Sequence, residues 1–176
     1  MRKLVLLASA ALTATAAAAQ PRQWPLTPDG YGPARIGMTR NQVQDALGTA
    51  LQGQPLEPGA ACIELVPERG YPDMVFMFLD RRLSRIVVQG ASRVATPRGI
   101  RVGATAAEVR RAYPAGLRAE EHAYTGAPAE YLTFWTRGAR ARGVGRRGVR
   151  FTTDENRRVD TIIAGNGSIQ YIEGCA

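Results

Sequence analysis

Two stretches of the chain share one pattern of hydrophobic and polar positions. Residues 34–48 and 100–114 align without a gap, and each carries Arg, an aliphatic residue and Gly ahead of a threonine. A glutamine or glutamate stands three residues after each threonine, which is the spacing of a capping box at a helix start. Apolar side chains then recur at i, i+3 and i+4, which predicts a short amphipathic helix in each stretch.

The residues that carry this pattern fall at matching places. The predicted caps are Thr39 with Gln42, and Thr105 with Glu108; the apolar stripes are Val43, Ala46 and Leu47, and Val109, Ala112 and Tyr113. Gly48 and Pro114 are residues that end helices, so each predicted helix is about two turns long.

Each predicted helix is followed by a pair of strand-like runs. Residues 75–79 and 83–88 flank a polar turn, and residues 148–152 and 158–163 flank a second, longer one. Alternating or continuous apolar residues around a polar turn predict β-hairpins. The tail at 169–172 adds a possible edge strand.

These elements predict an α+β fold with two tandem helix–loop–β-hairpin repeats, at 32–92 and 97–166. Neither repeat buries much core alone. We therefore expect the repeats to share one antiparallel sheet with the helices on one face. An N-terminal segment, 20–31, and a C-terminal tail, 167–176, complete one domain of ordinary size.

The N-terminus has the pattern of a secretory signal peptide. A basic start at 1–3 precedes an uncharged apolar stretch at 4–16, and three alanines at 17–19 provide a cleavage site after Ala19. The apolar stretch is shorter than a membrane-spanning helix requires. We expect a periplasmic or secreted protein with no membrane span in the mature chain.

The two cysteines, Cys62 and Cys175, predict one disulfide in an exported chain. Two unpaired buried thiols are the alternative. A bridge would tie the tail to the middle of the fold. In the chain-entropy model, closing so long a loop contributes at most about 4–5 kcal/mol.

Part of the repeat pattern resembles a known family. The matching residues are 36–39 (Ile-Gly-Met-Thr), 42–43 (Gln-Val) and 47–48 (Leu-Gly). They resemble the SmpA/OmlA envelope lipoproteins, and the tandem arrangement resembles the β-lactamase inhibitor protein. The resemblance implies helix-then-strand modules and a non-enzymatic binding module, with an envelope or extracellular protein as partner. The ending 171–175 (Tyr-Ile-Glu-Gly-Cys) resembles exported bacterial proteins of which some are called lectins.

The net charge of +8 is carried almost wholly by arginine, since Lys3 is the only lysine. Nucleic-acid binders usually mix Lys with Arg along a basic face, so we expect no nucleic-acid partner. The arginines are densest at 137–150, among glycines and alanines. This segment predicts either a loop that contacts an anionic glycan, lipid or acidic protein, or a solvated insertion.

Aromatic residues precede that loop and are candidate binding anchors, although residues 131–135 also read as a strand whose rings would be core. Tyr, Trp and Arg dominate binding hot spots. The candidate binding residues are Arg137, Arg140, Arg142, Arg146, Arg147, Tyr124, Tyr131 and Trp135.

The sequence offers little for catalysis, cofactors or metals. His122 is the only histidine, and it lies in a polar stretch without a nucleophile motif. Glu120, Glu121 and Glu130 read as scattered surface acids. The G-x-G-x-x-G match at 143–148 precedes a strand and not a helix, which argues against a dinucleotide site. We therefore expect no enzyme, cofactor or metal centre; an anionic glycan or lipid is the alternative to a protein partner.

Overall fold

The computed structural model describes residues 23–55, 57–136 and 145–175. The predicted signal peptide and its cleavage point after Ala19 therefore lie outside the described residues. So do Arg137, Arg140 and Arg142 of the arginine-rich segment.

The described residues form two antiparallel sheets. The large sheet has the order β4-β5-β6-β7-β11-β10-β9-β8, and the small one the order β1-β2-β3. The large sheet consists of β4 (Leu51–Gln52), β5 (Cys62–Pro67), β6 (Met74–Leu79), β7 (Arg82–Gln89), β8 (Leu117–Glu121), β9 (Glu130–Trp135), β10 (Gly148–Thr153) and β11 (Val159–Gly165). The small sheet consists of β1 (Leu26–Thr27), β2 (Gly30–Tyr31) and β3 (Ala34–Arg35).

The predicted α+β fold of two helix–loop–hairpin repeats is wrong. The protein is mostly β, with eleven strands and two α-helices in the described residues. Each helix is followed by four strands and not by a single hairpin, and residues 26–35 form a separate sheet. Strands β4, β5 and β8 were not predicted, because their residues lack regular alternation of apolar and polar side chains. On β8, four of five residues are exposed.

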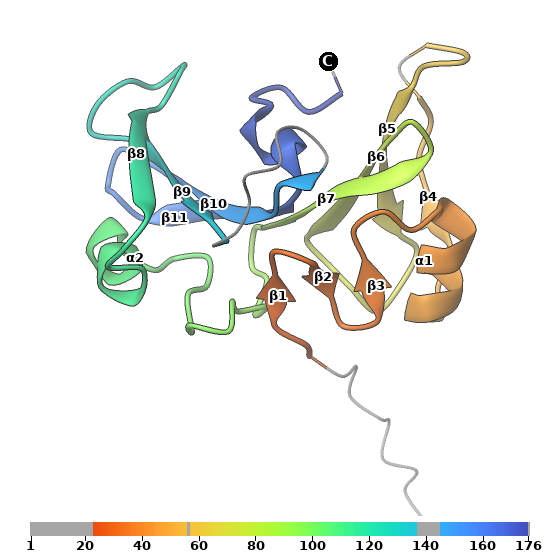
Figure 1. The fold of residues 1–176 in the computed structure, drawn as a ribbon, viewed down its shortest axis with the longest axis horizontal. Coiled ribbons are helices and arrows are strands. Elements are labelled where there is room, and N and C mark those ends of the chain that lie inside the picture. The colour runs from red at the N-terminus through yellow and green to blue at the C-terminus, as the bar shows by residue number, and fades with distance from the viewer. Residues whose placement is uncertain (1–22, 56, 137–144, 176) are drawn as a thin grey trace, which may run out of the picture.

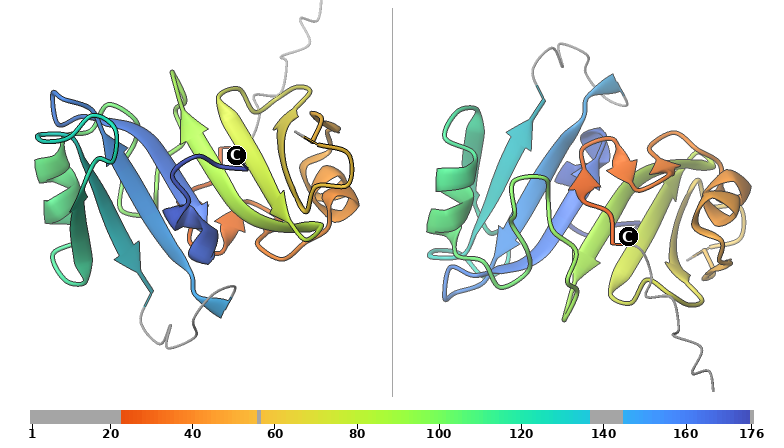
Figure 2. Two further views of the ribbon diagram at one scale, coloured as in Figure 1. Left: turned by 90° about the horizontal axis from the view of Figure 1, so that it is seen from above. Right: turned by 90° about the horizontal axis from the view of Figure 1, so that it is seen from below.

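The helices form where the capping pattern placed them. In α1 (Arg40–Leu47) and α2 (Ala106–Ala112), the cap threonine accepts the N3 backbone N–H, and the N3 side chain accepts the threonine backbone N–H. Gly48 ends α1 in the left-handed conformation at φ 67°. Figure 1 shows the two helices near opposite ends of the large sheet, and both views of Figure 2 agree.

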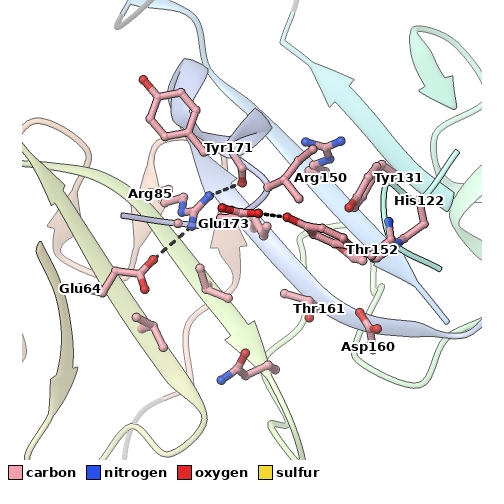
Figure 3. A pocket seen from close by; sticks show the side chains of 17 residues that line it. Glu64, Arg85, His122, Tyr131, Arg150, Thr152, Asp160, Thr161, Tyr171 and Glu173 are labelled. Atoms are coloured by element: carbon pink, nitrogen blue, oxygen red, sulfur yellow. Dashed lines mark hydrogen bonds and ion pairs between the residues drawn. The ribbon is translucent and has the colours of Figure 1, made fainter. Parts of the chain in front are cut away.

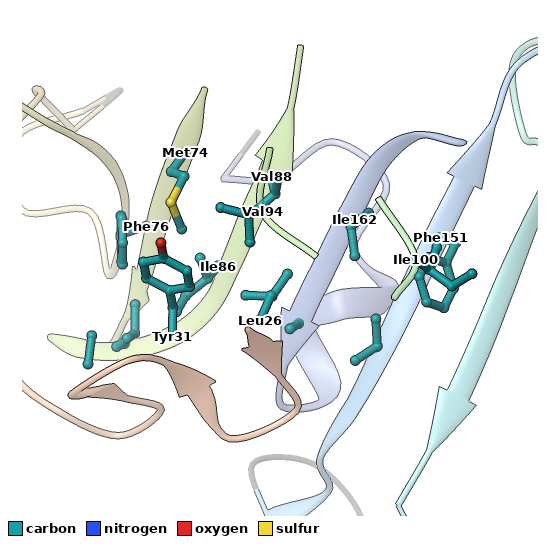
Figure 4. Packing of buried hydrophobic residues seen from close by; sticks show 14 of the residues in the cluster. Leu26, Tyr31, Met74, Phe76, Ile86, Val88, Val94, Ile100, Phe151 and Ile162 are labelled. Atoms are coloured by element: carbon teal, nitrogen blue, oxygen red, sulfur yellow. The ribbon is translucent and has the colours of Figure 1, made fainter. Parts of the chain in front are cut away.

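The core lies between one face of the large sheet and the small sheet with the helices. Figure 4 shows Leu26 and Tyr31 of the small sheet packed toward Phe76 and Ile86 of the large one. These four side chains are at most 2% exposed. Burial of this apolar face is the main stabilising term, and it leaves the opposite face free for polar side chains.

The C-terminal segment crosses that opposite face. The predicted Cys62–Cys175 disulfide is confirmed, with the two Cα atoms 5.4 Å apart. The predicted edge strand at 169–172 is wrong, because a 3₁₀ turn, η2 (Gly167–Gln170), occupies this stretch. The Asn166 side chain caps the turn by accepting the Ser168 backbone N–H at 2.9 Å. Within the described ranges, no helix is long and apolar enough to cross a membrane.

Candidate functional site

A pocket of about 500 Å³ lies on the face of the large sheet that points away from the core. Side chains alternate between the two faces along each strand. On β7, Ile86 belongs to the core, whereas Arg85 and Val87 line the pocket. The tail residues 171–174 pass over the floor, so the pocket is bounded by sheet and tail (Figure 3).

Two buried arginines lie in the floor. Arg85 on β7 and Arg150 on β10 are each only 4% exposed. Arg85 donates to the carbonyls of Ser168 and Tyr171 at 3.1 and 2.8 Å, and to the Glu64 carboxylate at 3.1 Å. These bonds fix the tail to the sheet face.

Arg150 has similar partners. It donates to the Ile169 carbonyl and to the Glu120 carboxylate, both at 3.3 Å, and its guanidinium carbon lies 3.8 Å from the centre of the Tyr131 ring. Burial lowers the pKa of Arg150, and Glu120 opposes that shift. The positive charge of Arg85 lowers the pKa further, so the two cations act on one another across the floor.

Arg85 and Arg150 each have a buried Nε–H group without a hydrogen-bond partner among the described residues. A buried unpaired donor is costly and rare in native proteins. Among the described residues that line the pocket, these two N–H groups are the buried side-chain donors without a partner.

One wall of the pocket is aromatic. The His122 ring stacks on Tyr131 with centroids 4.7 Å apart and an interplanar angle of 29°. Its Nδ1 accepts the backbone N–H of Thr125 at 3.1 Å. A neutral imidazole with Nδ1 as acceptor carries its proton on Nε2, so the ring offers a donor from its other nitrogen.

The rim combines exposed apolar residues with a link to the tail. Tyr124 is 67% exposed, and its hydroxyl donates to the Glu173 carboxylate. Tyr171 and Ile172 of the tail are 47% and 51% exposed. All four residues line the pocket. Contact between Tyr124 and Glu173 therefore joins the 122–128 loop to the tail above the floor.

The structure divides the predicted binding residues between two places. Tyr124 and Tyr131 line the pocket. The Arg146 guanidinium instead lies 3.8 Å from the Trp135 ring centre, and Arg147 Nε lies 3.8 Å from the Asp29 carboxylate. Neither Arg146, Arg147 nor Trp135 lines the pocket.

The three glutamates considered for catalysis line a second cavity of about 520 Å³, next to α2 and β8. Each has a partner: Glu120 pairs with Arg150, Glu130 with Arg110 at 2.7 Å, and Glu121 accepts the Ala127 backbone N–H at 3.2 Å. Among the described residues, no group of three His, Cys, Asp or Glu side chains is placed to hold a metal.

The sequence reasoning missed most of the pocket floor. Arg85 lies inside the run 83–88, and its charge in an apolar strand was the available signal. Arg150 was noticed only as the end of the arginine-rich segment. Thr152 and Asp160 lie on one predicted hairpin, but Glu64 had no signal, because only the pairing of β7 with β11 brings the two halves of the sheet together.

No protein-family model matches the chain, and no curated protein matches it. Among solved structures, the chain is similar to an extracellular protein containing a SCP domain from Bacillus anthracis str. Ames. The TM-score is 0.46 at 10% sequence identity, and the match covers 76% of this chain and 45% of that one. The chain thus spans less than half the length of that neighbour. Membership of the SmpA/OmlA family stays a prediction.

Proposed function

We propose that this protein is a non-enzymatic binding module outside the cytoplasm and that it holds a carbohydrate in the pocket on the sheet face. One observation carries the proposal. Among the described residues, four large hydrophobic side chains are strongly exposed, and three of them, Tyr124, Tyr171 and Ile172, surround this pocket. Exposed apolar residues gathered around a polar floor are typical of a binding site.

The chemistry of the pocket matches the two kinds of surface on a sugar. The exposed ring of Tyr124 offers apolar contact to C–H groups. The floor offers donors from arginine and acceptors from the Asp160 carboxylate and the Thr161 hydroxyl. Because cations and carboxylates are both present, a polyhydroxyl ligand finds donors and acceptors side by side.

The disulfide supports a location in the periplasm or outside the cell. Disulfides form and persist in oxidising compartments and are rare in the cytosol. The Cys62–Cys175 bond leaves no free cysteine in the described residues. This agrees with the export predicted from residues 1–19.

The polar contacts favour binding over catalysis. Nδ1 of His122 accepts a backbone N–H, and the Glu120 and Glu130 carboxylates are engaged with arginines. A general base needs an available lone pair close to its substrate, whereas Nδ1 of His122 already accepts a hydrogen bond and each of the two carboxylates is paired with a cation.

The test is a glycan array followed by calorimetry with purified protein. We expect Tyr124→Ala to weaken binding of the captured glycan about fivefold, because one ring contact contributes about 1 kcal/mol. Val66→Ala is the matched control, since Val66 is also exposed, at 48%, but does not line the pocket. Unchanged affinity of the Tyr124→Ala variant would place the binding elsewhere.

A protein partner is the second candidate. The observation that favours it is the protruding rim, since Tyr124 at 67% exposed is a typical hot-spot residue. A pull-down from envelope extract separates the two candidates. A protein captured by the wild type and lost with Tyr124→Ala and Tyr171→Ala would favour the protein partner.

A further inference from the structure

The free Nε–H groups of Arg85 and Arg150 indicate more about the ligand. Nε–H and one terminal N–H of a guanidinium form a parallel pair that matches the two oxygens of a carboxylate. Arg85 uses only its terminal nitrogen on Glu64, at 3.1 Å, and Arg150 only its terminal nitrogen on Glu120, at 3.3 Å. Each carboxylate therefore makes a single contact, and half of each pair is unused.

The acids that now contact the arginines can be displaced. The side chains of Glu64 and Glu120 are 39% and 52% exposed, so either carboxylate can turn to water at small cost. The arginine side chains are only 5% exposed and cannot do the same. A ligand carboxylate would supply the interaction that the buried cations lack.

The opposite side of the pocket suits hydroxyl groups. Figure 3 shows Arg85 and Arg150 on the side of the tail, and Thr161 and Asp160 on the other side. A hydroxyl both donates and accepts, which matches a threonine hydroxyl next to an aspartate carboxylate. The pocket thus has one end suited to an anion and one end suited to hydroxyls.

We propose that the ligand is an acidic sugar, a uronate unit whose carboxylate binds Arg85 and Arg150 while its hydroxyls face Thr161 and Asp160. The inference rests on the proposed carbohydrate binding and names its ligand class. It predicts that the carboxylate, and not the sugar ring alone, decides affinity.

The first test changes the ligand and leaves the protein intact. Calorimetry compares the trimers of galacturonate, glucuronate and mannuronate with their methyl esters, which keep the hydroxyls and lose the charge. We expect at least one free acid to bind tenfold or more tightly than its ester. Equal affinities would overturn this inference and leave carbohydrate binding standing. Binding of no uronate and of no glycan on an array would overturn both.

The second test changes the protein. Arg85→Lys and Arg150→Lys keep the charge and remove the parallel pair of donors, so each should weaken binding of the free acid about tenfold more than it weakens binding of the ester. Arg69→Lys, on an exposed residue outside the pocket, is the control. Circular dichroism checks that each variant folds.

The Glu64→Gln variant tests whether Glu64 competes with the ligand for Arg85 or whether the Glu64–Arg85 ion pair is purely structural. Because Glu64 occupies a donor that the ligand carboxylate needs, its removal should tighten binding of the free acid. A purely structural Glu64–Arg85 pair predicts unchanged or weaker binding, and that result would overturn the proposed geometry.

Discussion

At the scale of single residues, the two buried arginines decide the character of the outer sheet face. Arg85 donates to two backbone carbonyls of the C-terminal segment and to Glu64, and Arg150 packs on Tyr131. Burying a cation is costly unless it is paired and hydrogen-bonded. Arg85 therefore holds the tail in place as well as lining the pocket.

Replacing Arg85 with methionine should lower the free energy of unfolding by about 2–4 kcal/mol, because Ser168 and Tyr171 carbonyls and the Glu64 carboxylate lose their donor. Urea unfolding measures the change. Arg69→Met, on an exposed residue, should stay within about 0.5 kcal/mol of wild type. Equal stabilities of the two variants would show that the tail does not depend on Arg85.

A second residue-scale prediction concerns pH. The backbone N–H and the hydroxyl of Thr105 hold the pKa of Glu108 below its usual value. A lowered folded-state pKa stabilises the fold at pH values above the unfolded-state pKa. This stabilisation is lost as the pH falls through the folded-state pKa. Unfolding midpoints measured from pH 7 down to pH 2 should fall less steeply for Glu108→Gln than for wild type. Parallel curves would contradict the capping role of the charge.

At the scale of elements, short sequence patterns correctly predicted the helix starts and the hairpins, which depend on residues close together in the chain. The capping boxes at Thr39 and Thr105 and the hairpins β6–β7 and β10–β11 formed as expected. Strand β8 has no regular alternation and was not predicted, because it is its pairing with β9 that places it in the sheet. The floor of the pocket was missed for the same reason.

Removing the N-cap side chain of α2 should lower the free energy of unfolding by about the amount that a helix cap contributes. Thr105→Ala is expected to lower the free energy of unfolding by about 1 kcal/mol, because the Glu108 backbone N–H loses its acceptor. Thr105→Ser keeps the hydroxyl and should remain close to wild type. Denaturant midpoints measure both variants, and a loss of similar size in both would point to the threonine methyl group.

Gly165 allows β11 to approach β7. Its φ is 157°, and an added Cβ would overlap the Ser84 carbonyl oxygen. Gly165→Ala should therefore destabilise the protein by more than about 2 kcal/mol. Gly99→Ala meets open space at φ 81°, so it carries backbone strain alone, about 1 kcal/mol. Thermal unfolding compares them, and equal losses would show that β7 and β11 can separate slightly.

At the scale of the whole molecule, the disulfide connects sheet, tail and pocket. Cys62 and Cys175 are 113 residues apart in sequence, and the tail between η2 and Cys175 forms one side of the pocket. Because the tail is fixed by both the disulfide and Arg85, the rim residues Tyr171 and Ile172 stay in position.

Replacing both cysteines with serine should lower the free energy of unfolding by up to about 4–5 kcal/mol. It should also weaken ligand binding, because Tyr171 and Glu173 are no longer held over the floor. Urea unfolding and calorimetry on the double variant measure the two effects. Unchanged binding would show that the Arg85 contact alone positions the tail.

The pairing of β7 with β11 also has a consequence for synthesis. Val87 and Val88 on β7 pair with Ile163 and Ile162, which the ribosome adds much later. Until β11 arrives, the newly made first half carries an open, apolar strand edge, a known starting point for aggregation. A chain that stops before β11 should therefore aggregate and not accumulate as a stable half.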